Sequence, residues 1–451
     1  YSLSVILILL YQTFLNSTRF RPLSLDTPKP LFPIAGLPLI QHHVEACAKL
    51  EACKEILIIG SYTTNTMAQF VNDMQKEYHV IIRYLQEFTP LGTGGGLYHF
   101  RDQVRAGNPS AFFLLNGDVC ADFPLKELWH FHEERSNALL TLLSLRKNFV
   151  FYKFDNLISL VIVLHVQYIL TLQVTIMGTE ATRQQSVHYG CMVRESSTKS
   201  VTHYVEKPNS YVSTLINCGV YVCSLQVFHT MADAFQKKQD GFYSGNGQTS
   251  LHPGYMSFEQ DVLMPLAGTN KCYAMQVNNW WSQVKTPGSA IYANRHYLEL
   301  HRDRIPKDKP CTILPDVFVH PTATVDSTAV IGPNVSIGAG VTIKAGVRIK
   351  ESIVLNNATV HEHALVMYSV VGQEASVGEW SRVEGTPSDP DPNKPFAKMD
   401  NTPLFNTDGR LNPSITILGA SVVVPAEMIL LNSIVLPHKH LTRSFKHEII
   451  L

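Results

Sequence analysis

The sequence predicts an α/β protein in which a domain with a mostly parallel sheet is followed by a C-terminal β-helix. Strand-like apolar runs alternate with helical periods from residue 5 to about residue 300, which is typical of a parallel sheet covered by helices on both faces. After residue 304, small or branched apolar residues recur every six positions, which is typical of a hexapeptide β-helix. With 451 residues, the chain is long enough for two or three domains.

The first part holds alternating elements and one proline-rich stretch. We expect strands over 5–10, 55–60 and 80–85 and helices over 40–48 and 67–78. Residues 18–33 contain four prolines, and we expect them to forbid a helix and to form an extended loop.

The repeat of the second part runs in two series. One extends from Val317 to Val383 and the other from Ile313 to Leu355, each with a spacing of six. The repeat breaks over 385–412, which is rich in Pro, Asp and Asn, and resumes at Ile417. We expect two domains, 1–304 and 305–451, with the loop 385–412 projecting as an interaction site.

The stretch 85–118 is typical of a nucleotide site. Four glycines at 92, 94, 95 and 96 precede a helical segment and a strand that ends near Asp118. Glycines let backbone N–H groups approach a phosphate or a base, and an acid after such a strand can hold Mg²⁺. The carboxylate of Glu87 can accept both N–H groups on the pairing edge of guanine. The alternative is a flexible turn followed by an ordinary strand end.

Basic and polar residues elsewhere extend this site. Arg19 and Lys29 lie after the first strand, where they can point at a triphosphate or at solvent. The pair Glu206 and Lys207 and the turn at Asn217 can hold sugar hydroxyls and a phosphate. Taken singly, each is an ordinary strand end.

The balance of charges limits the kinds of partner, and the cysteines indicate the cellular compartment. Lys and Arg together number 37 and so do Asp and Glu, which argues against a nucleic acid or an anionic membrane as the main partner. The eight cysteines form no CxxC pair, and we expect reduced side chains in a cytoplasmic protein.

Two apolar runs invite a membrane interpretation. Residues 3–11 lack a basic n-region and a cleavage site, so we expect a strand rather than a signal peptide. Residues 157–177 are long enough to span a bilayer, but His165, Gln167 and Gln173 interrupt them. We favour extra strands or an atypical insertion at about 147–178 over a membrane helix. The start at Tyr1 suggests an incomplete sequence.

Several motifs resemble one family across almost the whole chain. They are TRFRPL, KPLFP, LQEFTPLGTGGG, LNGDVCADFP, VEKP, INCGVY and LLNSIVLPHKHL. They resemble the mannose-1-phosphate guanylyltransferases, or GDP-mannose pyrophosphorylases, which join a Rossmann-like nucleotidyltransferase domain to a left-handed hexapeptide β-helix. The segments EGTPSDPDPN and WSQ resemble those of the regulatory alpha subunits.

The resemblance implies roles for individual residues. In active members a sugar 1-phosphate attacks GTP while two aspartates hold Mg²⁺. Arg19 and Lys29 would then be vestigial phosphate contacts, and Asp118 a weak first metal ligand. The remaining substrate-binding residues implied are Glu87 and Gly92 at the guanine, and Gly190, Glu206, Lys207 and Asn217 around the mannose phosphate.

The chain departs from the family in two places. Gln283 stands where the second aspartate is expected, and a neutral amide supplies no charge to Mg²⁺, so both the metal and catalysis are in doubt. Leu9, Leu10 and Ser17 replace glycines of a first loop that is also longer, and their side chains would crowd a triphosphate.

We therefore expect a regulatory subunit that binds GDP-mannose and mediates feedback inhibition of a catalytic beta subunit. We expect it to form a hetero-oligomer with that subunit and to self-associate through the β-helix. One alternative is an active guanylyltransferase. Another is a scaffold subunit like those of the translation-initiation exchange factor.

Overall fold

A computed structural model describes residues 5–11, 17–136, 174–243, 254–304, 311–400 and 403–451. The chain divides into two compact units. The first comprises residues 1–14, 43–281 and 393–398, and the second comprises 15–42, 282–392 and 399–451. The expected boundary at residue 304 stays a prediction.

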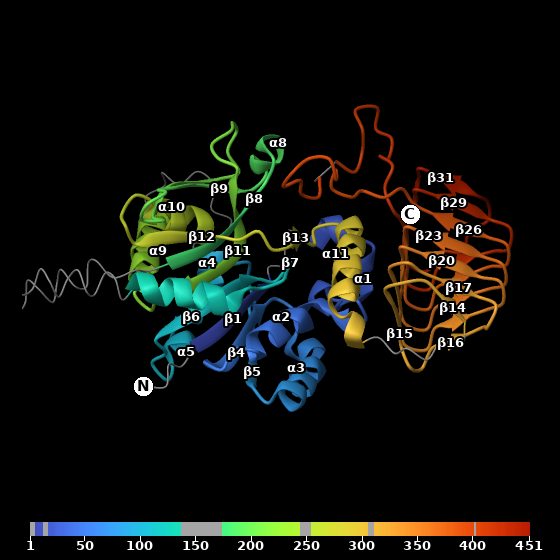
Figure 1. Ribbon diagram of the computed structural model, residues 1–451, viewed down its shortest axis with the longest axis horizontal. Coiled ribbons are helices and arrows are strands. Elements are labelled where there is room, and N and C mark those ends of the chain that lie inside the picture. The colour runs from blue at the N-terminus through green and yellow to red at the C-terminus, as the bar shows by residue number, and fades with distance from the viewer. Residues whose placement is uncertain (1–4, 12–16, 137–173, 244–253, 305–310, 401–402) are drawn as a thin grey trace, which may run out of the picture. The chain divides into compact units, whose positions relative to one another are not determined.

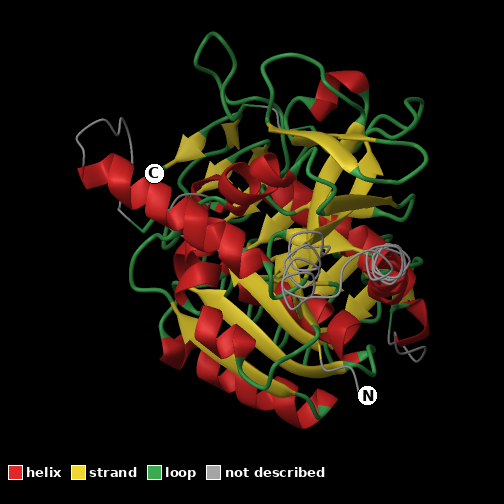
Figure 2. Ribbon diagram, turned by 90° about the vertical axis from the view of Figure 1, so that its left-hand side faces the viewer, coloured by secondary structure: helices red, strands yellow, loops and turns green. Residues whose placement is uncertain are grey.

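A mixed sheet forms the centre of the first unit (Figures 1 and 2). Its strands are β1 (Val5–Tyr11), β4 (Cys53–Gly60), β5 (Ile81–Gln86), β6 (Ala111–Asn116), β8 (Val174–Glu180), β9 (Gly190–Arg194), β10 (Val201–Glu206), β11 (Leu215–Cys223) and β12 (Cys272–Gln276). Strands β5, β4, β1 and β6 follow one another in parallel. β11 is antiparallel to β6, β8 and β9. The expected parallel sheet is therefore one half of a mixed sheet.

Helices accompany these strands in the predicted alternation. They are α2 (Leu39–Ala48), α3 (Thr64–Tyr78), α4 (Gly92–His99), α5 (Arg101–Arg105), α8 (Arg183–Ser186), α9 (Val227–Tyr243), the π-helix η3 (Glu259–Leu263) and α10 (Met264–Leu266). The strands predicted over 5–10, 55–60 and 80–85 and the helices predicted over 40–48 and 67–78 are confirmed. Leu57, Phe112 and Tyr221 are fully buried in the core, so the apolar runs serve the packing that their pattern predicts.

The expectation of an extended loop over 18–33 is wrong. This stretch holds three short helical turns, η1 (Ser17–Phe20), α1 (Leu23–Asp26) and η2 (Lys29–Leu31). Pro22 is the N-cap residue of α1, and Pro30 lies in the first turn of η2. Proline is tolerated at these positions because the first N–H groups of a helix have no intrahelical partner.

The second unit contains a β-helix with three parallel sheets, consistent with the predicted left-handed type (Figure 1). The first sheet comprises β14 (Thr312–Ile313), β17 (Val330–Ile331), β20 (Arg348–Lys350), β23 (Leu365–Met367), β26 (Arg382–Glu384), β29 (Ile429–Leu431) and β31 (Phe445–Lys446). The second comprises β15 (Val317–Val319), β18 (Val335–Ile337), β21 (Ile353–Val354), β24 (Ser369–Val371), β27 (Thr416–Leu418), β30 (Ile434–Val435) and β32 (Ile449–Ile450). The third comprises β16 (Thr324–Val325), β19 (Thr342–Ile343), β22 (Thr359–Val360), β25 (Ser376–Val377) and β28 (Val423–Val424).

The unbroken six-residue register is wrong in the middle of the β-helix. Val330 pairs with Arg348, 18 residues later, whereas Arg348 pairs with Leu365 and Leu365 with Arg382, each 17 residues later. The missing residue shifts the core positions by one. Val354, Val360 and Val366 therefore lie in the core, one residue before positions 355, 361 and 367, which an unbroken spacing of six would give.

Helix α11 (Pro287–Leu300) belongs to the second unit together with a hairpin of β2 (Pro33–Ile34) and β3 (Leu37–Pro38). The buried amide oxygen of Asn294 accepts hydrogen bonds from Ala35 N at 2.8 Å and from Ser336 Oγ at 2.6 Å. One side chain on α11 therefore fastens the hairpin to the second face of the β-helix.

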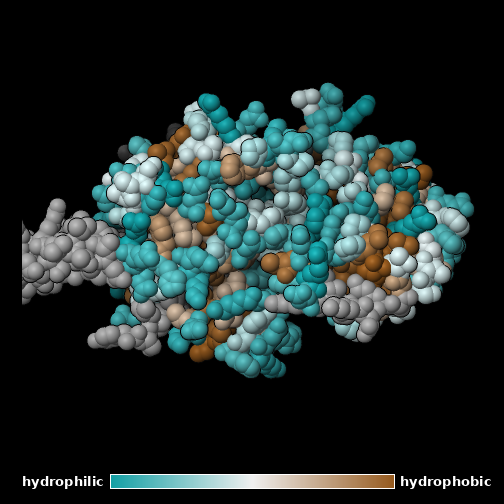
Figure 3. Space-filling view, viewed as in Figure 1, coloured by the Kyte–Doolittle hydropathy of each residue, from teal (hydrophilic) through white to brown (hydrophobic). Residues whose placement is uncertain are grey.

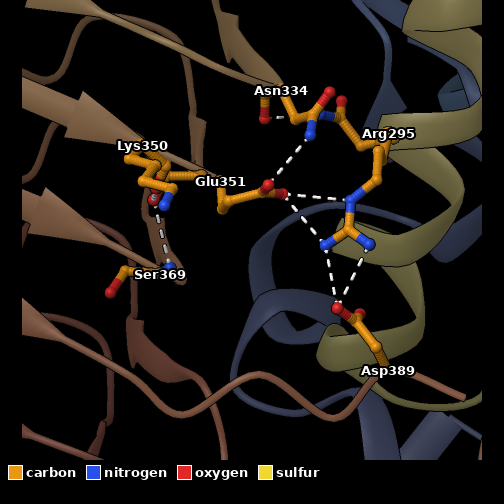
Figure 4. Close-up of polar contacts among 8 residues, drawn as sticks. Arg295, Asn334, Lys350, Glu351, Ser369 and Asp389 are labelled. Carbon is orange, nitrogen blue, oxygen red and sulfur yellow. Dashed lines mark hydrogen bonds and ion pairs between the residues drawn. The ribbon is translucent and has the colours of Figure 1, made fainter. Parts of the chain in front are cut away.

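A charged cluster fastens α11 to the start of the 385–412 loop (Figure 4). The Arg295 guanidinium donates to Glu351 Oε2 at 3.0 and 3.1 Å and to Asp389 Oδ2 at 3.1 Å. Asn334 Nδ2 donates to the other Glu351 oxygen at 2.8 Å. Glu351 is buried, so its charge depends on these donors.

The apolar run at 157–177 lies mostly outside the described residues. Its end, Val174 to Met177, lies in β8 between β11 and β12. None of the helices in the described ranges has the length and hydropathy needed to cross a bilayer.

Candidate functional site

A buried carboxyl group follows strand β5. The backbone N–H of Glu87 donates to Gly60 O at 2.7 Å, which fixes the chain beside β4. The Glu87 residue is only 7% exposed, and within the described ranges no group donates a hydrogen bond to its carboxylate. Burial raises the pKa of Glu87 to about 7. This carboxyl group therefore has two unused acceptor oxygens.

The glycines of α4 make space for neighbouring groups. A side chain at Gly96 would overlap the Glu87 carboxylate. Gly92 has φ +78°, and a Cβ there would lie 2.5 Å from Met256 O. The N–H groups of Gly94 and Gly95 donate to that same Met256 oxygen at 2.8 and 3.0 Å. Those two donors are thus used by the protein, contrary to the expectation that they face a phosphate or a base.

A second group of polar residues lies where β9, β10 and β11 meet. Glu206 on β10 pairs in register with Gly190 on β9, and a Cβ at Gly190 would overlap the Tyr204 hydroxyl. The Tyr204 hydroxyl donates to Glu206 Oε2 at 2.9 Å. Lys207 Nζ lies 3.3 Å from Glu206 Oε1 and is largely exposed, so it is free to reach an anion.

Asn217 organises this second group. Its Nδ2 donates to the hydroxyls of Tyr204 and Tyr221, both at 2.9 Å, and its Oδ1 accepts from Gly219 N at 2.9 Å. Both amide protons are therefore used inside the protein, and one lone pair on Oδ1 remains for a ligand. We call Glu87, Gly92, Thr93 and Gly96 the Glu87 cluster. We call Gly190, Tyr204, Glu206, Lys207 and Asn217 the Glu206 cluster.

The end of β6 supplies a further acceptor. Asn116 Oδ1 is buried without a hydrogen-bond partner in the described structure, and its amide lies against Gly219, where a Cβ would be 2.8 Å from Asn116 Nδ2. A buried, unpaired acceptor of this kind is typical of a position that a ligand or water completes.

The residues described offer little to a metal ion. Asp118 follows β6, but the described ranges contain no group of three or more His, Cys, Asp or Glu side chains able to hold a metal. Mg²⁺ prefers carboxylates and substrate phosphates. One aspartate does not make such a site, and we derive no step through Mg²⁺.

Three predicted site residues belong to the second unit, and their place at the site stays a prediction. Arg19 is exposed, whereas Lys29 is buried, with Nζ 5.8 Å from the centre of the Phe20 ring. Gln283 ends strand β13 (Trp281–Gln283), and its Oε1 is buried without a partner among the described residues. A neutral, unpaired acceptor fits a ligand hydroxyl or N–H better than it fits a hard cation.

Part of the predicted loop, Asn393–Lys398, lies in the first unit. Gln185 on α8 donates from Nε2 to Lys398 O at 2.7 Å, and its Oε1 accepts from Lys398 N at 2.8 Å. The Lys398 side chain is half-buried, with Nζ 5.8 Å from the centre of the Trp281 ring. Two backbone hydrogen bonds therefore hold this segment within the first unit, and the role of the loop as an interaction site stays a prediction.

The sequence motifs assign no role to four residues that contact the predicted ones. Tyr204, Tyr221, Thr93 and Glu259 take part in the polar contacts around both clusters. Tyrosines within apolar strands look like core residues, and no motif singles out Glu259. Only their hydrogen-bond partners in the folded structure indicate that these residues belong to the site.

Comparisons with known proteins agree with this architecture. The model of the Nucleotidyl transferase family matches residues 16–148 and 151–297, and the model of the GMPPB C-terminal domain matches residues 313–450. The fold and these matches define a nucleotidyltransferase-type protein with a C-terminal β-helix.

Three relatives narrow the class, and each alignment covers 97% of this chain and 97% of the relative. The relative from Drosophila melanogaster is 59% identical over 459 residues. The relatives from Xenopus tropicalis and Homo sapiens are each 48% identical, over 443 and 444 residues. All three are named mannose-1-phosphate guanylyltransferase regulatory subunit alpha. The chain belongs to this family.

Proposed function

We propose that this protein binds GDP-mannose in its nucleotidyltransferase-type domain and mediates feedback inhibition of a catalytic beta subunit of mannose-1-phosphate guanylyltransferase. The observation that carries the proposal is the buried Glu87 carboxylate, which has no hydrogen-bond donor in the described structure. Guanine offers N1–H and N2–H donors side by side, and a carboxylate can accept both. Adenine lacks this pair of donors.

The Glu206 cluster suits the sugar and its phosphate. Glu206 and the remaining lone pair of Asn217 can accept from sugar hydroxyls, while the exposed ammonium group of Lys207 can contact a phosphate. Asn116 Oδ1 adds an acceptor that has no hydrogen-bond partner among the described residues. Gln283 stands where the second metal-binding aspartate is expected, which supports binding rather than turnover as the role of this protein.

The partners follow from the family and from the β-helix. The relatives carry the name of a regulatory subunit, so we propose a hetero-oligomer with a catalytic subunit and self-association through the β-helix. On the sheet from β14 to β31, Ile429, which is 43% exposed, and half-buried Leu365 lie on either side of Arg382. Apolar side chains lie among polar ones over the part of the β-helix in view in Figure 3. Six of the described cysteines, at positions 47, 53, 191, 218, 223 and 272, are buried and form no disulfide, which suits a cytoplasmic location.

Reconstitution with the catalytic subunit tests this function. GDP-mannose synthesis by the mixed complex should fall as GDP-mannose accumulates, and the fall should weaken when this chain carries Glu87→Gln. The matched control is Glu134→Gln on the exposed part of helix 125–136. Equal inhibition with and without this chain would contradict the regulatory role. Ordinary turnover by the purified chain alone would favour the enzyme alternative.

A further inference from the structure

The carboxyl group of Glu259 is hydrogen-bonded to the glycine-rich helix α4. Thr93 Oγ1 donates to Glu259 Oε2 at 2.7 Å, and Ser257 Oγ donates to the same oxygen at 3.1 Å. Phe258 N in turn donates to Thr93 Oγ1 at 2.8 Å. Thr93 directly follows Gly92 in the Glu87 cluster, so a movement of Glu259 would pull on that cluster.

The same carboxyl group interacts electrostatically with the Glu206 cluster. Burial, with the nearby charge of Glu206, raises the pKa of Glu259. Tyr204 and Tyr221 also feel the charge of Glu259, and both phenols are held by Asn217 Nδ2. The Tyr204 hydroxyl in turn donates a hydrogen bond to Glu206 Oε2. One interior region thus contains two carboxyl groups and two phenols.

Folding alone gives little reason for an acid at this position. Burying a carboxyl group costs free energy unless its partners compensate. The start of η3 already has another acid, because Asp261 Oδ2 accepts from Ser257 N at 2.7 Å. The flanking Phe258 and Val262 are core residues. Two side-chain donors hold the Glu259 carboxyl group in one place, which points to a role in the site.

Building on the proposed function, we propose that Glu259 is a positioning residue that couples the Glu87 cluster to the Glu206 cluster, so that binding of the guanine base favours binding of the mannose phosphate. The physical reason is that Thr93, Glu259 and Phe258 are joined by hydrogen bonds, and the Phe258 ring packs edge-on against the Tyr221 ring with 5.2 Å between ring centres. A ligand in one cluster orders Thr93, Glu259 and the two tyrosines, and a ligand in the other then loses less conformational entropy. By linkage, the effect is the same in both directions.

Calorimetric titration of the full chain with two halves of the ligand measures this coupling. Guanosine is titrated without and with saturating mannose 1-phosphate, and the ratio of the two affinities is the coupling factor. We expect a factor of about five or more in the unaltered protein, the lower end of typical allosteric coupling. Glu259→Ala and Thr93→Val should each reduce it to near one.

Conservative and distant variants separate positioning from stability. Glu259→Gln keeps an oxygen that accepts from Thr93 and Ser257, so it should retain most of the coupling. Glu134→Ala, on the exposed part of helix 125–136, should change nothing. A variant with a lowered unfolding temperature but an unchanged coupling factor would reveal a merely structural role and overturn the inference.

The two proposals fail in different ways. If the unaltered protein does not bind GDP-mannose, the proposed function is overturned and the coupling with it. If GDP-mannose binds but Thr93→Val and Glu259→Ala leave the coupling factor as in the unaltered protein, only the role of Glu259 is overturned.

Discussion

The carboxylate of Glu87 occupies the space that a side chain at position 96 would need. Gly96 is buried on α4, while Glu87 follows β5. The missing Cβ allows a charged group to enter an otherwise closed part of the core. Gly96 therefore makes room for the Glu87 carboxylate.

Gly96→Ala should therefore displace Glu87 and weaken GDP-mannose binding by about tenfold or more, and overpacking should cost about 1–3 kcal/mol of stability. Calorimetric titration and thermal unfolding measure the two effects. Gly241→Ala on α9 is the matched control, because a Cβ there meets nothing within 4 Å. Unchanged affinity in Gly96→Ala would contradict the role of the Glu87 carboxylate.

The pH dependence of binding should follow the raised pKa of Glu87, which is about 7. Guanine needs the carboxylate, so the free protein must release a proton below pH 7. GDP-mannose affinity should then fall by up to about a hundredfold between pH 8 and pH 5. Glu87→Gln should bind weakly at every pH. A flat profile in the unaltered protein would show that Glu87 does not contact the base.

The stability of the free protein should show the opposite trend. Between about pH 4.5 and 7, folded Glu87 keeps its proton while the unfolded chain has lost it. The contribution of Glu87 to the free energy of unfolding therefore decreases as pH rises through this window. Comparing unfolding midpoints of the unaltered protein and Glu87→Gln at pH 5 and 8 isolates this contribution. It is absent if the difference between the two proteins is the same at both pH values.

Gln283→Asp tests whether a metal site was lost. Mg²⁺ should change the GDP-mannose affinity of the unaltered protein by less than about twofold, since a neutral amide gives the ion no charge. The aspartate variant should gain about tenfold from Mg²⁺, whereas the neutral control Gln283→Asn should gain nothing. Strong Mg²⁺ dependence before any substitution would reopen the enzyme alternative.

The two hydrogen bonds between the Gln185 side chain and the Lys398 backbone should protect the loop from proteolysis. Trypsin can cleave after Lys398, whereas Lys394 precedes a proline. Gln185→Ala removes both hydrogen bonds to the Lys398 backbone and should speed cleavage after Lys398 about tenfold, if local opening costs about 1.4 kcal/mol less. Gln69→Ala is the control, because that side chain contacts only exposed Asp73. Equal cleavage rates would show that these two hydrogen bonds do not hold the segment.

The two ion pairs of Arg295 should contribute different amounts to the free energy of unfolding. Arg295→Met leaves buried Glu351 with Asn334 as its remaining donor, which should lower the free energy of unfolding by about 2 kcal/mol or more. Asp389→Asn should cost less than about 1 kcal/mol, because Asp389 is exposed. Chemical unfolding of the full chain compares the two. A larger loss from Asp389→Asn would contradict this ranking.

Local patterns predicted the elements that depend on local chemistry. The strands β1, β4 and β5 follow from their apolar runs, and the β-helix follows from its repeat. The predictions failed where the outcome depends on the exact position of a residue within a helix or within the repeat. Pro22 and Pro30 start helical turns rather than prevent them. A one-residue shortening after Ile349 moves the core position from Leu355 to Val354, and an average spacing of six conceals it.

The candidate site was predicted only in outline. Glu87 and Glu206 stand in recognisable motifs, but the donors used by Asn217 depend on Tyr204 and Tyr221 from neighbouring strands. Glu259 lies 166 residues after Thr93 in the chain. Contacts over such separations depend on the topology of the sheet, which local composition does not encode.

Calorimetric titration of the purified full chain with GDP-mannose, in the presence of a chelator at pH 8, tests the central claim most directly. We predict a dissociation constant on the order of micromolar, equivalent to about 8 kcal/mol, and much weaker binding of ADP-mannose, which lacks the adjacent N–H donors of guanine. No binding of GDP-mannose, or equal binding of both sugar nucleotides, would contradict the claim that Glu87 reads guanine in this site.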